Sequence, residues 1–181
     1  MALNFDDTRL CVIGDIDGFT PAISSLVSMM RYARKTTLDA AKNLSVEQLD
    51  YLHDKQSNSI AMLLFHIAAV DKLYQNAIFE GRINFNAEES ALWQKGLLEN
   101  RDEALKIRGN DFNYYKELLA DVREKTFVQL QEKDDDWLKK EFYDDMFKCT
   151  VNNWFYWFHV CEDEINHRGQ ISWLKKRLPK K

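Results

Sequence analysis

The scarcity of helix-breaking residues is the feature that most constrains the fold of this chain. Its 181 residues include only six glycines and two prolines, and the prolines, Pro21 and Pro179, stand near the two ends. Both residue types interrupt regular structure, while the plentiful Leu, Lys, Glu and Ala favour helix over sheet. The sequence therefore predicts an all-α protein. Its length suits one hydrophobic core, so we expect a single domain over residues 1–181.

Apolar residues recur at helical spacing in four long segments of the sequence. After an irregular lead-in over residues 1–19, Thr20 and Pro21 suit the start of a first helix that ends near Asn43. A short helix over 46–52 follows a capping-box pattern at Ser45 and Gln48. The other long helices are predicted over about 60–80, 111–133 and 151–177.

The connections between these segments differ greatly in length. Residues 82–110 form a long connection with at least one short helix, and a connection of this length allows the third helix to take a non-adjacent place in the bundle. A linker precedes the fourth helix, which Thr150 can cap. The predicted fold is a four-helix bundle with a long crossover between helices two and three.

Charge and composition exclude several classes of function. The net charge is −4, and the basic residues are dispersed among acids, so we expect no nucleic-acid partner. Cys11, Cys149 and Cys161 have no CxxC spacing, which suits a reducing compartment. The start of the chain is too polar for a secretory signal, and the longest apolar run, about 60–70, is far shorter than the ~20 residues of a membrane span. We expect a soluble, cytoplasmic protein.

The fourth predicted helix carries a pair of residues that could bind a metal ion. Asp163 and His167 are four residues apart, so their side chains lie on one face of a helix and can converge on one ion. Glu162 and Glu164 lie about 100° around the helix to either side and are expected to miss that point. This spacing is common, so the pair needs a third ligand from elsewhere.

His66 is the candidate for that third ligand. It interrupts the apolar run AMLLFHIAAV in a helix predicted to be buried, and a buried imidazole must find polar partners. A lone histidine of this kind is usually satisfied by one hydrogen bond. Two histidines and one carboxylate, however, form the minimal protein ligand set for catalytic Zn²⁺ and also the facial triad of non-haem Fe²⁺.

Two segments of the chain carry a family resemblance. Residues 57–71, with the stretch from His66 to Asp71, and residues 159–171, with His167, Arg168, Gly169 and Gln170, resemble the DinB/YfiT-like superfamily of four-helix-bundle proteins. The resemblance covers roughly residues 20–177. It implies a divalent-metal site in which His66 and His167 are ligands.

Asp163 stands where this superfamily usually has a further histidine. The resemblance implies Zn²⁺ or Ni²⁺, and because aspartate is a harder ligand than imidazole, Fe²⁺ and Mn²⁺ are the alternatives. If Asp163 does not bind the ion, His159 is the reserve ligand. The resemblance also suggests that Arg168 pairs with Asp71, and helical Gly169 suggests close contact with a neighbouring helix.

The resemblance implies a metal-dependent enzyme, such as a transferase or hydrolase acting on a small-molecule substrate, for example a low-molecular-weight thiol. The alternative is a non-catalytic or stress-associated protein that the metal stabilises. Fe²⁺-dependent oxygenation is suggested only by the ligand set. Bundles of this superfamily often pair, so a homodimer is also expected.

Overall fold

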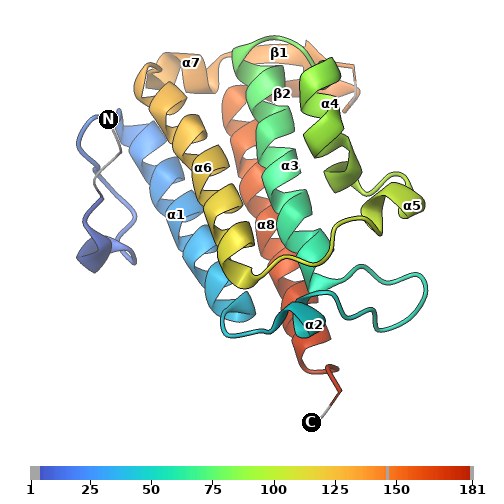
Figure 1. Ribbon diagram of the computed structural model, residues 1–181. Coiled ribbons are helices and arrows are strands. Elements are labelled where there is room, and N and C mark those ends of the chain that lie inside the picture. The colour runs from blue at the N-terminus through green and yellow to red at the C-terminus, as the bar shows by residue number, and fades with distance from the viewer. Residues whose placement is uncertain (1–4, 146, 180–181) are drawn as a thin grey trace.

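A computed structural model describes residues 5–145 and 147–179 and shows a bundle of four long helices (Figure 1). These helices are α1 (Pro21–Ala41), α3 (Ile60–Phe79), α6 (Phe112–Gln131) and α8 (Asn153–Lys175). Both α1 and α3 pack against α6 and α8, so α1 and α3 lie diagonally across the bundle. The predicted all-α four-helix bundle is confirmed, and α3 and α8 lie side by side.

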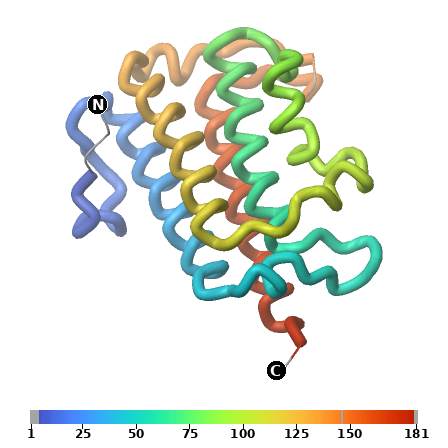
Figure 2. The backbone as a smooth tube through the Cα atoms, in the orientation of Figure 1, coloured from blue at the N-terminus to red at the C-terminus, as the bar shows by residue number. Residues whose placement is uncertain are grey.

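The long crossover leads from α3 to α6 through three short helical segments. These are α4 (Ala87–Trp93), η2 (Gln94–Leu97) and α5 (Arg101–Ala104). The crossover runs along the outer side of α3 and returns the chain to the end of the bundle where α3 begins (Figure 2). As a result α3 and α6 run in the same direction. The long crossover between the second and third long helices is confirmed, and it leads to a place for α6 directly against α3.

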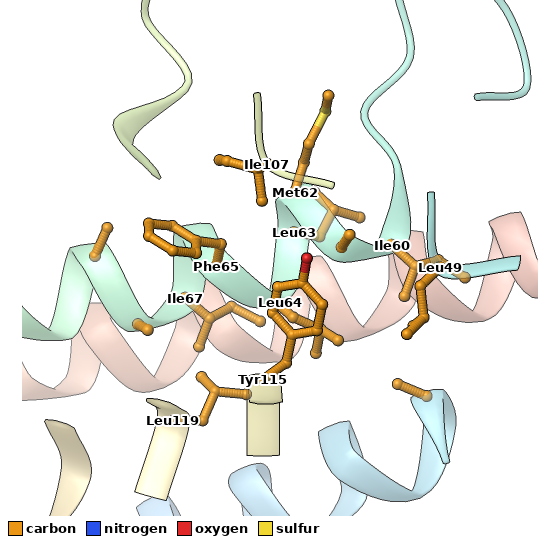
Figure 3. Packing of buried hydrophobic residues seen from close by; sticks show 14 of the residues in the cluster. Leu49, Ile60, Met62, Leu63, Leu64, Phe65, Ile67, Ile107, Tyr115 and Leu119 are labelled. Carbon is orange, nitrogen blue, oxygen red and sulfur yellow. The ribbon is translucent and has the colours of Figure 1, made fainter. Parts of the chain in front are cut away.

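The first three turns of α3 are buried on nearly all sides. Ile107 of the crossover lies on one side of this helix, and Tyr115 and Leu119 of α6 lie on the opposite side (Figure 3). Because α3 has neighbours all round, its apolar residues do not form a single stripe. The helix is therefore fixed by packing from several directions.

The N-terminus of α2 is capped by residues next to it in the chain, whereas that of α1 is capped by a residue far away in the sequence. Ser45 and Gln48 form the predicted capping box of α2 (Val46–Leu49). The side chain of Thr20 does not cap α1. Instead, Asp135 of α7 (Asp135–Lys139) accepts hydrogen bonds from the Ala22 backbone N–H at 3.1 Å and from the Thr20 hydroxyl. A carboxylate there also complements the helix dipole.

The segment before α8 contains a β-hairpin where the sequence predicted only a linker. Strands β1 (Glu141–Asp144) and β2 (Cys149–Asn152) pair antiparallel, with Phe142 opposite Val151. Thr150 therefore lies in a strand, and the cap of α8 is Asn152, whose side chain accepts a 2.8 Å hydrogen bond from the Phe155 N–H.

The lead-in contains the short 3-10 helix η1 (Asp7–Arg9) within its described part; residues 1–4 of the predicted lead-in lie outside the described residues. None of the helices in the described ranges has the length and apolar character that crossing a membrane requires.

Candidate metal centre

His66, Asp163 and His167 come together between α3 and α8. Each offers one ligand atom, and these atoms all lie within 4.8 Å of one another. Their side chains are mostly buried, with exposed fractions of 15%, 22% and 13% respectively. The structure thus brings together the three side chains singled out from the sequence.

The imidazole of His66 is oriented by the crossover. Its Nδ1 lies 2.8 Å from the carbonyl oxygen of Gly96 in η2, so Nδ1–H donates there and the lone pair is on Nε2. A Cβ on Gly96 would lie 2.6 Å from the Cβ of Ala69 and 2.7 Å from the ring of Phe65. Only glycine lets η2 lie this close to α3. A backbone carbonyl behind a metal-binding histidine is the common way of fixing its tautomer.

The free side of His66 faces the other two groups. Its Nε2 lies 3.7 Å from Oδ2 of Asp163, and Nε2 of His167 lies 3.2 Å from Oδ1 of the same carboxylate. Ligand atoms about 2.1 Å from a tetrahedral ion are about 3.4 Å apart, between these two separations. The two imidazole rings are 4.6 Å apart at 81°, so they meet edge to face.

Two polar atoms of the cluster are buried without a hydrogen bond. Within the described residues, Oδ2 of Asp163 and Nδ1 of His167 have no partner. Burial lowers the pKa of His66, against the opposing effect of Asp163, and this favours the neutral form that a metal ion requires. An unsatisfied buried carboxylate oxygen costs free energy, which a bound cation would offset. The residues present therefore fit a divalent ion.

A buried ion-pair network lies directly behind this cluster. Glu164 points away from Asp163, as expected, and its carboxylate accepts hydrogen bonds from Arg34 at 2.8 Å and Arg123 at 2.9 Å. Arg123 also donates to Asp71 at 2.6 Å. The four residues come one each from α1, α3, α6 and α8, so their charges connect all four helices.

Opposite charges offset the effect of burial on the pKa of two members of the network. Burial opposes ionisation of Glu164, but Arg34 and Arg123 outweigh it and hold the pKa of this carboxyl below its ordinary value. Burial likewise opposes the charge of Arg123, yet Asp71 and Glu164 raise its pKa. No local sequence signal marks the network, because its members are far apart in the chain.

Two expectations about α8 are corrected by the structure. Arg168 does not pair with Asp71, since its guanidinium donates to the hydroxyl of Thr36 and Arg123 takes the predicted place. Gly169 makes no close contact with another helix, because a Cβ at this position would have nothing within 4 Å.

The reserve ligand, His159, is not part of the cluster. It lies among aromatic rings, stacked 6.1 Å from Phe155 and edge to face 5.6 Å from Phe147. Its Nδ1 lies 3.2 Å from the carboxylate of Glu162. Among the described residues only His66, Asp163 and His167 form such a group, so the geometry favours Asp163 over His159.

The sequence model of the DinB family matches residues 19–178, which include all four long helices and the cluster. The chain belongs to the DinB family. A comparison with curated proteins finds no match. DinB membership confirms the predicted superfamily and agrees with the helical fold, while the activity of this DinB protein has to be inferred from its own site.

Proposed function

We propose that this DinB protein binds one divalent metal ion through His66, Asp163 and His167 and uses it in a transferase or hydrolase reaction. The observation that carries the proposal is the meeting of three ligand atoms within 4.8 Å, from helices far apart in the sequence. The orientation of His66 by Gly96 and the unpartnered oxygen of Asp163 support it.

The ligand set favours Zn²⁺ or Ni²⁺, with Fe²⁺ and Mn²⁺ as alternatives. Imidazole and carboxylate suit all four ions, and the carboxylate makes the site harder than one of three histidines. Three protein ligands leave at least one coordination position for water or substrate, as in catalytic rather than structural zinc sites. The open coordination position favours a catalytic role for the ion.

A bound divalent ion supplies a Lewis acid that lowers the pKa of a thiol or of water. The residues of the chain provide the setting. Gly96 holds His66 in the Nε2 tautomer, and Asp163 provides one negative charge between the two imidazoles. The mostly buried position limits the access of bulk water, which strengthens electrostatic interactions there. A low-molecular-weight thiol is the proposed substrate class.

A non-catalytic role is the second candidate. His66 is on α3, whereas Asp163 and His167 are on α8, so a bound ion would link the two helices. An ion that binds only the folded chain raises its stability by mass action. A site of this kind would stabilise the bundle without turnover.

Metal analysis of purified protein tests the shared part of both candidates. The parent is expected to hold about one equivalent of metal, and His66→Ala and His167→Ala are expected to lose it. His159→Ala is the matched control, because it removes a histidine of α8 outside the cluster. Unchanged metal content in the first two variants, or loss only in the control, would refute the site.

Activity separates the two candidates. Metal-stripped protein is reconstituted with Zn²⁺ or Ni²⁺, and its melting temperature and its conjugation of a thiol to an electrophilic acceptor are measured. Metal-dependent turnover that His66→Ala abolishes supports the enzyme. Stabilisation without turnover supports the non-catalytic role.

A further inference from the structure

A groove of about 560 Å³ is lined by residues of α8 and of the loop that follows α2, and one of them, Asn166, is next to the candidate ligand His167 in the chain. This volume falls in the range of sites that bind small molecules. The polar side chains lining the groove are four carboxamides and one hydroxyl: Gln56, Asn58, Asn166, Gln170 and Ser57. Charged side chains are absent from the described residues that line it.

The α8 side of the groove continues the face that carries the candidate ligands. Gln170 is three residues after His167 and seven after Asp163, which places it on the same side of the helix. Asn166 directly precedes His167. One helical turn rises about 5.4 Å, so Gln170 lies within about one turn of His167 along α8.

The loop side of the groove is held in place by hydrogen bonds. Arg101 of α5 donates to the carbonyl oxygen of Ser57 at 2.8 Å and to Oδ1 of Asn58 at 3.1 Å. Asp54 accepts from the backbone N–H groups of Gln56 at 2.8 Å and Ser57 at 2.7 Å. This wall is therefore ordered before any ligand binds, which lowers the entropy cost of binding.

An indole ring closes the far end of the groove. Trp173 is 44% exposed, and its ring is flanked by His53 at 5.1 Å and by the guanidinium of Arg177 at 3.6 Å. The ring is thus fixed and partly open. A ligand with a short apolar portion could bury it against this indole.

We infer that the groove is the subsite for an uncharged, peptide-like part of the substrate whose reacting thiol lies at the metal centre. This inference rests on the proposed function. Carboxamides donate and accept hydrogen bonds, and so match amides and hydroxyls. Within the described residues, the side chains of Asn166 and Gln170 form no hydrogen bond with the protein, so both are available. Among the described residues that line the groove none carries a charge, so a charged ligand group would lose water there without a counter-ion in the lining.

Gly169 provides a way to fill the groove without disturbing the core. It lines the groove, and a Cβ added there would have open space around it. Gly169→Phe would place a ring in the groove, and Gly169→Ala is the matched control. Both substitutions replace a glycine inside a helix by a residue with better helix propensity, so both variants are expected to fold.

The test uses full-length protein reconstituted with Zn²⁺ and two synthetic probes, acetyl-Cys-Gln-amide and acetyl-Cys-Glu-amide. Calorimetry measures Zn²⁺ binding and peptide binding separately. The glutamine peptide is expected to bind at least about tenfold more tightly than the glutamate peptide. Gly169→Phe is expected to lower the affinity for the glutamine peptide by about tenfold or more. Its Zn²⁺ affinity is expected to stay within about twofold of that of Gly169→Ala.

The outcomes distinguish the two proposals. If the parent protein does not bind Zn²⁺, the proposed function is refuted. If Zn²⁺ binds normally, any of three results refutes the assignment of the groove as a substrate subsite. These are equal affinity for the two peptides, unchanged peptide affinity in Gly169→Phe, and no measurable binding of the glutamine peptide to the parent.

Discussion

Arg123 is the best place to test how the bundle is held together. Its side chain is 4% exposed and donates to Asp71, to Glu164 and to the backbone carbonyl of Met30. Arg123→Met keeps an unbranched apolar chain but leaves two buried carboxylates with Arg34 as their remaining cation. Removing one partner of a buried ion pair costs about 3–5 kcal/mol, because the other charge is left uncompensated.

We therefore expect Arg123→Met to lower the free energy of unfolding by about 3–5 kcal/mol. For a chain of this size, each kcal/mol lowers the melting temperature by about 2–4 °C, so the expected fall is about 6–20 °C. The assay is urea unfolding of metal-free protein followed by circular dichroism, with linear extrapolation to water. Metal-free protein separates the network from the metal centre.

Two further variants control the comparison. Lys125→Met removes the same charge from an exposed position of α6 and is expected to change stability by less than about 0.5 kcal/mol. Arg123→Lys keeps the charge but cannot reach both carboxylates with a planar fork, so an intermediate loss is expected. If Arg123→Met costs less than about 1 kcal/mol, the network does not stabilise the bundle in the way described.

Three more predictions follow from single contacts. Gly96→Ala puts a methyl group 2.6 Å from the Cβ of Ala69, so the free energy of unfolding should fall by about 1–3 kcal/mol. The displaced Gly96 carbonyl would no longer orient His66, so Zn²⁺ binding should weaken about 10–100-fold. Unchanged stability and Zn²⁺ affinity would contradict this prediction. Arg82 lowers the pKa of Glu89 from its ordinary 4.5, so the carboxylate contributes stability that is lost as the pH falls below that value. In unfolding measured as a function of pH, Glu89→Gln should reduce this loss of stability at acid pH. An unchanged acid dependence would argue against the prediction. Cys161 is buried with a raised pKa, so a disulfide reagent should label it much more slowly than the two exposed cysteines, and equal rates would show that α8 opens readily.

The local features of the bundle could be read from the sequence. Helical periodicity and the scarcity of breakers located all four long helices, and Ser45 with Gln48 located a cap, because these signals depend only on residues a few positions apart. The spacing of Asp163 and His167 placed two candidate ligands on one helix face for the same reason.

The hairpin before α8 escaped prediction. Its strands are four residues each, too short for a clear alternating pattern, and the hairpin contacts α8 through Phe142, whose ring lies 5.7 Å from that of Tyr156. The cap that Asp135 provides for α1 is separated from Ala22 by more than a hundred positions, so no local signal announces it.

Sequence alone determined the helices and the single helix face shared by Asp163 and His167. It also marked His66 as a polar residue within the apolar run of α3. Only the tertiary structure decided that His66 meets those two groups, that the Gly96 carbonyl orients it, and that Arg123 takes the partner expected for Arg168. The physical reason is that a helix fixes the relative directions of its own side chains through its backbone hydrogen bonds. The direction of one helix face relative to another depends on the packing of the whole core.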